Sequence, residues 1–95
     1  MDFLLEEGLS QKLISDLESK NDEGVIDLIK IECENVKEII RYIKEIGIKR
    51  VDELLLGYIE LFLKDAEIVK KTFNKYNISE VVEFINADVS YIENI

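Results

Sequence analysis

Ten residues in the middle of the chain decide the fold class: Leu54-Leu55-Leu56-Gly57-Tyr58-Ile59-Glu60-Leu61-Phe62-Leu63. Eight of them are apolar and one is charged. On a helix these apolar residues would cover most of the surface, and a helix that is apolar nearly all round is buried on most sides. We therefore expect one central helix from Lys49 to Lys64, with Gly57 marking either a bend or the close approach of a neighbouring helix.

The composition of the whole chain is that of a folded helical domain. Its 95 residues are 47% hydrophobic and 35% charged, with no proline and four glycines. This length suits one domain, and the absence of proline suits helices joined by short glycine or asparagine turns. We expect residues 1–95 to form a single all-α domain, a compact bundle or short stack of about five to six helices.

Capping residues and apolar spacing divide the rest of the chain into helices. Ser10 is expected to cap an amphipathic helix, and Asp65 to cap the helix that follows the central one. Residues 22–46 fit either one long bent helix or two helices that meet at Asn35, and we favour two. Ser79 is expected to cap a last helix with apolar residues on two sides.

The sequence contains an internal repeat with an offset of about thirty residues. Residues 42–49 align with residues 72–79, and residues 3–10 form a partial third copy. The recurring unit is a helix ending in Gly or Asn, then an apolar residue, then a capped helix. Such periods are typical of stacked helix pairs, although two unrelated amphipathic helix pairs would also look alike.

Two segments resemble known helical-repeat families. Residues 34–43 followed by Gly47 resemble the second helix of an ankyrin repeat, although residues 26–29 lack that family's threonine-proline-leucine-histidine start. Residues 51–62 with their flanks resemble the repeat of mitochondrial transcription terminators, with Ile59 in place of that family's proline and without its basic surface. Both resemblances imply an α-helical repeat fold and no particular activity.

Charge is unevenly distributed along the chain, which carries a net charge of −9 at pH 7. Residues 1–36 hold ten acids and three bases, residues 37–75 hold seven acids and nine bases, and residues 76–95 hold four acids and no bases. This balance disfavours direct contact with nucleic acid or anionic lipid and favours a basic protein partner. Keeping a small protein soluble is the alternative reason for such a charge.

The bases of the middle region stand at pairing distances from acids. Glu34 lies three residues before Lys37, and Glu67 lies three residues before Lys70. These spacings place opposite charges side by side on a helix. We therefore expect internal ion pairs there rather than a patch that contacts phosphates.

The residues that most enzymes require are missing. The chain has no histidine, and its one cysteine, Cys33, lies on an apolar helical stripe where we expect a buried structural thiol. Glu34 and Glu38 lie one helical turn apart but lack the histidine partners of helical-bundle metal sites. The loop at residues 19–24 has Lys30 where a calcium loop requires glutamate. We expect no catalytic residue, no metal site and no cofactor.

The sequence also predicts a cytoplasmic protein with no membrane contact. No stretch approaches the roughly 18 apolar residues of a membrane span. The N-terminus lacks the basic and apolar regions of a secretory signal, and a single cysteine allows no internal disulfide.

Two hypotheses for function remain. The first is a small cytosolic inhibitor, of the immunity, antitoxin or anti-defence (anti-CRISPR) type, that presents an acidic surface to a basic nucleic-acid-handling protein. The second is a helical-repeat adaptor, or a structural domain that forms homo-oligomers through the second apolar side of its last helix. The residues that we predict to bind a protein partner are Glu6, Glu7, Asp16, Glu18, Asp22, Glu23, Asp27, Phe84 and Tyr91.

Overall fold

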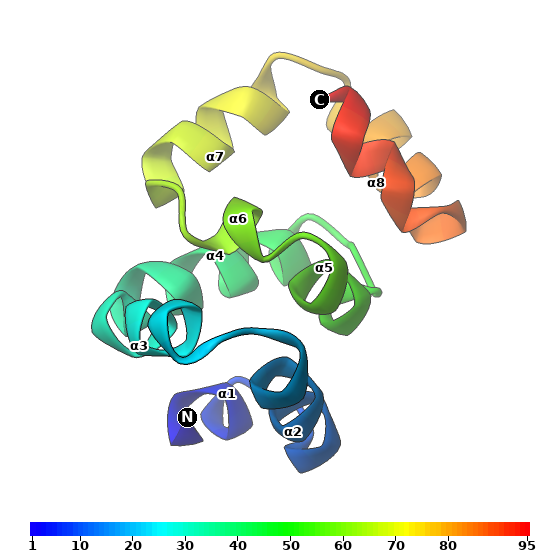
Figure 1. The fold of residues 1–95 in the computed structure, drawn as a ribbon. Coiled ribbons are helices and arrows are strands. Elements are labelled where there is room, and N and C mark those ends of the chain that lie inside the picture. Colours follow the sequence, from blue (N-terminus) through cyan, green and yellow to red (C-terminus); the bar gives the residue numbers. More distant parts are fainter.

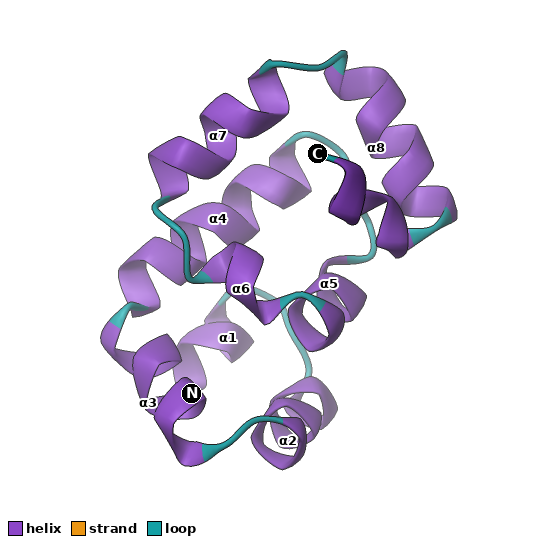
Figure 2. Ribbon diagram, turned by 45° about the horizontal axis from the view of Figure 1, so that its top comes forward, coloured by secondary structure: helices purple, strands orange, loops and turns teal.

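The chain folds into helices only, as a computed structural model of residues 1–95 shows. Helix accounts for 77% of the residues, and there are no strands (Figure 2). The elements are α1 (Asp2–Glu6), α2 (Gln11–Lys20), α3 (Glu23–Ile31), α4 (Cys33–Glu45), α5 (Val51–Gly57), α6 (Ile59–Phe62), α7 (Ala66–Asn74), α8 (Ile78–Ala87) and the 3-10 helix η1 (Val89–Asn94). The predicted all-α class is confirmed, with six helices of seven residues or more and three shorter ones. None of the helices has the length and apolar character needed to cross a membrane.

The helices form three groups around one central element. α1 and α2 lie at one end of the molecule, α7, α8 and η1 lie at the other, and α3 to α6 lie between them (Figure 1). α4 is the central helix, because it contacts α1, α3, α5, α6 and α7. Its apolar residues recur three and four positions apart, so that one face of the helix turns toward the core.

The predicted central helix from Lys49 to Lys64 is therefore wrong in two respects, since α4 takes the central place and the predicted helix is interrupted. Residues 51–57 form α5, Tyr58 leaves the helical conformation with φ −139° and ψ 54°, and α6 follows. Gly57 is not a point of close approach, because no neighbouring atom lies within 4 Å of where its Cβ would stand. The bend that the sequence offered as the alternative is present, and it is made at Tyr58, the residue after Gly57.

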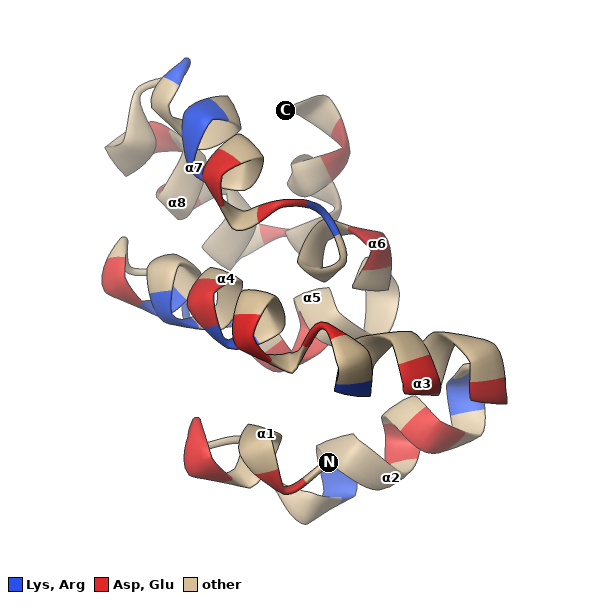
Figure 3. Cartoon of the chain, turned by 90° about the vertical axis from the view of Figure 1, so that its left-hand side faces the viewer, with Lys and Arg blue, Asp and Glu red and all other residues tan.

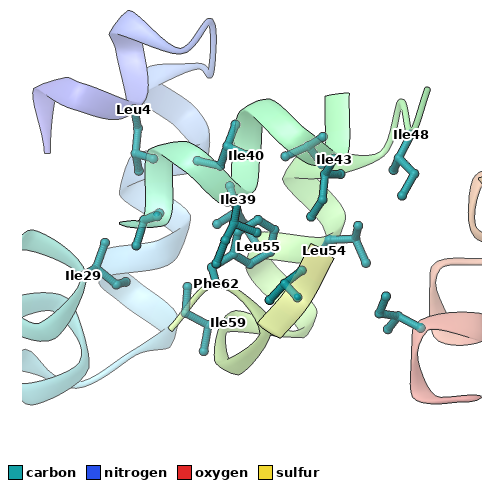
Figure 4. Close-up of a cluster of buried hydrophobic side chains, with 14 of the residues drawn as sticks. Leu4, Ile29, Ile39, Ile40, Ile43, Ile48, Leu54, Leu55, Ile59 and Phe62 are labelled. Carbon is teal, nitrogen blue, oxygen red and sulfur yellow. The ribbon is translucent and has the colours of Figure 1, made fainter. Parts of the chain in front are cut away.

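The apolar side chains of α5 and α6 nevertheless belong to the core. Because the chain turns at Tyr58, each short helix buries one face, and no single helix has to bury all of its surface. The two helices and α4 together supply much of one continuous apolar cluster (Figure 4). Their fully buried members are Val36, Ile39, Ile40, Ile43, Leu54, Leu55 and Phe62. The core contains no buried polar or charged residue.

Two helices, and not one, occupy residues 22–46, as favoured from the sequence. Their junction is Glu32, three residues before the predicted position at Asn35. Cys33 begins α4 and is half-buried, so the prediction of a buried thiol is only partly correct.

Asparagine side chains tie two loops to distant helices. Asn35 on α4 donates a hydrogen bond of 2.6 Å to the Lys64 carbonyl and accepts one of 2.9 Å from the N–H of Ala66, the first residue of α7. Asn86 on α8 in the same way accepts a bond of 2.8 Å and donates one of 3.1 Å to the backbone of residues 47–49. These bonds satisfy backbone groups that a loop would otherwise leave to water.

The predicted helix starts are correct at two positions and wrong at the third. Ser10 and Asp65 accept backbone N–H groups of the first turns of α2 and α7, as expected for N-caps. The last helix is capped by Asn77, so that Ser79 lies inside α8. It ends at Ala87, and Asp88 caps η1, which folds back onto α8.

Candidate protein-binding surface

The turn between α2 and α3 brings three of the predicted binding residues together. The Asp22 carboxylate accepts the Val25 N–H at 3.0 Å, and the Asn21 side chain donates to the Leu17 carbonyl at 3.0 Å. These bonds hold the turn, because they satisfy backbone groups left unpaired at the two helix ends. A shallow depression of about 240 Å³ beside the turn is lined by Glu18, Asn21, Glu23, Ile26, Asp27 and Lys30.

Glu18, Glu23 and Asp27, hereafter the turn acids, are exposed and form no ion pair within the chain. Lys30 is the one base of the depression. The turn acids do not converge on a point, and no cluster of acidic or cysteine side chains suitable for a metal ion is present. Spaced carboxylates of this kind suit contact with several positive charges on a partner's surface better than chelation of one ion.

Glu7 is engaged inside the molecule. The guanidinium of Arg41 on α4 donates to the two carboxylate oxygens of Glu7 at 2.9 and 2.8 Å, and Lys44 donates to its backbone carbonyl. The hydrogen bonds from Arg41 hold the pKa of Glu7 below its ordinary value. Its neighbour Glu6 is exposed and unpaired. The acidic end of α1 lies across the molecule from the turn between α2 and α3 (Figure 3).

Two further predicted acids have local partners. Asp16 pairs with Lys12, one helical turn earlier on α2, at 3.2 Å. Asp22 caps α3 through the bond described above. Of the seven acids predicted to bind a partner, the structure therefore groups only the turn acids around one depression.

The prediction of internal ion pairs in the middle region is correct only in part: Lys37, Arg41, Arg50 and Lys70 pair with acids, whereas Lys71 and Lys75 form no ion pair. Lys37 lies 3.0 Å from Glu34, and Lys70 lies 3.5 Å from Glu67 and 3.8 Å from Glu38. Exposed pairs of this kind contribute little to stability. They do cancel charge locally.

A hydrophobic residue that the sequence analysis did not single out lies beside the turn acids. Ile31, the last residue of α3, is 76% exposed. It follows Glu23 and Asp27 at successive intervals of four residues, which places all three on one face of the helix. The signal that could have revealed Ile31 is its position outside the buried stripe formed by Ile26 and Ile29.

The predicted aromatic residues lie at the other end of the molecule. Phe84 on α8 and Tyr91 on η1 face each other with ring centroids 4.9 Å apart and planes inclined by 35°. Phe84 remains 48% exposed, and Tyr91 is half-buried. The second apolar side predicted for the last helix is thus partly covered by η1, because the chain breaks at Asp88 and folds back.

A small apolar pocket lies between α6, α7 and η1. It has a volume of about 140 Å³ and is lined by Tyr58, Glu60, Leu61, Lys64, Val69, Thr72, Phe73, Ile92 and Ile95. The Tyr58 hydroxyl donates to the Glu93 carboxylate at 2.5 Å, and this bond raises the pKa of Tyr58. No local pattern predicts this pocket, because its walls come from three separate segments of the chain.

No family model, curated protein or solved structure matches this chain. The resemblances to ankyrin repeats and to transcription terminators stay predictions, and the function has to be inferred from the surfaces described above.

Proposed function

We propose that this chain is a non-catalytic protein-binding protein: a small acidic cytosolic inhibitor of a basic nucleic-acid-handling protein, of the immunity, antitoxin or anti-defence type. The observation that carries the proposal is the group of turn acids, three exposed carboxylates around one depression with no internal ion pair. Lys30 is the only base that lines the same depression.

Physical chemistry favours a basic partner at this surface. Exposed carboxylates attract a positively charged protein over about 10 Å at ordinary ionic strength, which speeds association and selects against acidic proteins. A surface that normally contacts phosphates supplies such positive charges. Burial of a few apolar side chains then contributes most of the affinity, and Ile31 stands on the same helical face as Glu23 and Asp27 for that purpose.

The proposed absence of catalysis rests on the inventory of side chains. The chain has no histidine, and its one thiol is half-buried at the start of α4. None of the turn acids makes a hydrogen bond or ion pair with another side chain that would prepare it to move a proton.

The test is the capture of a partner from an extract of the source organism. The combined Glu18→Lys, Glu23→Lys and Asp27→Lys variant should bind the captured protein at least about 100-fold more weakly than the wild type. Raising the salt concentration from about 50 to 200 mM should weaken wild-type binding markedly. Ile31→Ala should cost about tenfold in affinity and leave the salt dependence unchanged.

A matched control carries the same charge change elsewhere. Glu45→Lys, Asp52→Lys and Glu83→Lys alter exposed acids on α4, α5 and α8 and should reduce the affinity much less. Equal losses in the two triple variants would show that net charge, and not the turn acids, determines the affinity. An interaction insensitive to salt would show that another surface binds the partner.

A helical-repeat adaptor or self-associating domain is the second candidate. In its support, α4 contacts both α5 and α7, and α7 contacts α8, as expected for two stacked helix pairs. The turns after α1 and α4 are also alike, because Gly8 and Gly47 both have positive φ and the residue after each glycine donates to a carbonyl five positions back. Light scattering that found a stable oligomer, dissociated by Phe84→Glu, would favour this candidate.

A further inference from the structure

The apolar pocket between α6, α7 and η1, hereafter the anchor pocket, has the size of one side chain. Pockets for cofactors and metabolites enclose about 300–1,000 Å³, whereas this one has about 140 Å³. An apolar cavity of about 150 Å³ holds a single benzene ring. The anchor pocket therefore suits one leucine or phenylalanine side chain and is too small for a larger ligand.

The walls of the anchor pocket require an apolar occupant. The Tyr58 hydroxyl is bonded to Glu93, and the Thr72 hydroxyl donates to the Ile68 carbonyl at 2.9 Å. Both hydroxyl donors are thus already used, and the rest of the inner wall is hydrocarbon, from Leu61, Val69, Phe73, Ile92 and Ile95. A polar group placed against this inner wall would lose its water, and neither hydroxyl donor is free to replace it.

The charged residues around the opening of the pocket, hereafter the rim, favour positive charge in the residues on either side of the occupant. Glu60 lines the opening without an ion pair, and Glu93 lies beside it through its bond to Tyr58. Lys64 is the one base of the lining. Acids therefore outnumber bases around the opening.

The anchor pocket and the turn acids also share one side of the molecule. α6, η1 and the turn between α2 and α3 all lie toward the viewer in Figure 2 and toward the right in Figure 3. A single partner could reach both features.

We infer that the anchor pocket receives one bulky apolar side chain, leucine or phenylalanine, from a protein partner in which lysine or arginine flanks that side chain. This inference deepens the proposed function and rests on it for the nature of the occupant. Insertion removes the apolar side chain from water, and the flanking cations pair with the acids of the rim.

Short peptides test the inference without knowledge of the partner. The probes are acetyl-Lys-Leu-Lys-amide, its glycine analogue acetyl-Lys-Gly-Lys-amide and its acidic analogue acetyl-Glu-Leu-Glu-amide, each titrated into the full-length ¹⁵N-labelled protein at low salt. The first should shift the amide signals of Thr72, Phe73 and Ile92 saturably at millimolar concentration. The two analogues should bind at least about tenfold more weakly, because one lacks the apolar group and the other is repelled.

Two variants locate the site. Thr72→Phe places a ring in the pocket and should abolish the shifts, whereas Asn74→Phe places the same ring on an exposed part of α7 and should not. Glu60→Lys, which changes an exposed residue, should weaken binding of the lysine peptide several-fold, and Glu83→Lys on α8 should have little effect. The Glu60 comparison remains decisive if Thr72→Phe fails to fold.

Several results would overturn the inference: no saturable shift, equal binding of the leucine and glycine peptides, equal binding of the basic and acidic peptides, or binding of toluene without binding of the leucine peptide. The last would indicate a cavity for small molecules. A captured partner whose affinity depends on the turn acids but not on Thr72→Phe would refute the anchor pocket and leave the proposed function standing. Peptide binding as expected, with no basic partner captured, would support the anchor pocket and refute the proposed function.

Discussion

Two acidic regions of this molecule have similar composition and different surroundings. Glu7, at the end of α1, is held by two hydrogen bonds from Arg41, which lies 34 residues later in the chain. The turn acids face only Lys30 and form no ion pair. A count of acids in the sequence therefore does not measure the charge offered to a partner, because a base brought in by packing can neutralise an acid. Four predictions test this comparison.

The largest effect is expected from undocking α1, because the bond between Glu7 and Arg41 exists only while α1 rests on α4. Leu4 is fully buried at this contact. Leu4→Ala should lower the free energy of unfolding by about 3 kcal/mol, from lost burial and the cavity left behind. Urea unfolding followed by circular dichroism would measure the loss. The control Leu5→Ala changes a residue that is 43% exposed and should cost far less.

A smaller loss is expected from removing the base. Arg41→Ala leaves the Glu7 carboxylate without its two donors and should reduce stability by less than Leu4→Ala does. Arg41→Lys should restore only part of the difference, because an ammonium group cannot form two parallel bonds with a carboxylate. A double-mutant cycle with Glu7→Ala isolates the interaction. A coupling energy of zero would remove the distinction between Glu7 and the exposed Glu6.

The pH dependence of stability should further distinguish Glu7 from the acids that have no partner within the chain. The pKa of Glu7 is lower in the folded chain than its ordinary value of 4.5. Its contribution is therefore complete above that ordinary value and is lost as the pH falls through the lowered one. The difference in free energy of unfolding between wild type and Glu7→Gln should shrink when the pH is lowered from about 7 to about 3. A difference that grows on acidification would contradict the arrangement at Arg41.

The smallest effect is expected at the turn acids. Neutralising them by Glu18→Gln, Glu23→Gln and Asp27→Asn should change the free energy of unfolding by no more than about 0.5 kcal/mol, since none has an internal partner. The same variant should lose affinity for a basic protein. A large loss of stability would instead show that these carboxylates serve the fold.

Local features of the chain were predictable, because neighbouring residues determine them. Ser10 and Asp65 cap helices as expected, since the capping bond joins groups a few residues apart. Pairs such as Glu34 with Lys37 were predictable for the same reason. The break at Tyr58 was not, because the apolar run that surrounds it is equally compatible with a longer helix.

The candidate surface was predictable only in part. Composition indicated an acidic N-terminal third, but it could not separate Glu7 from Glu18, because Arg41 is distant in sequence. Ile31 is apolar like its buried neighbours on α3, and only the packing of α3 leaves it exposed. The anchor pocket left no mark on the sequence, because residues that line a pocket have the same apolar character as residues that fill a core.

By itself the sequence determined that this chain is all-α, where several of its helices begin and how unevenly its charge is distributed. These properties follow from spacing, capping and composition, which act over a few residues. Only the tertiary structure decided that α4 is the central helix, that Asn35 and Asn86 hold distant loops, and which acids stay free. Each of these depends on groups brought together from far apart in the chain, and the packing of the apolar core is what brings them together.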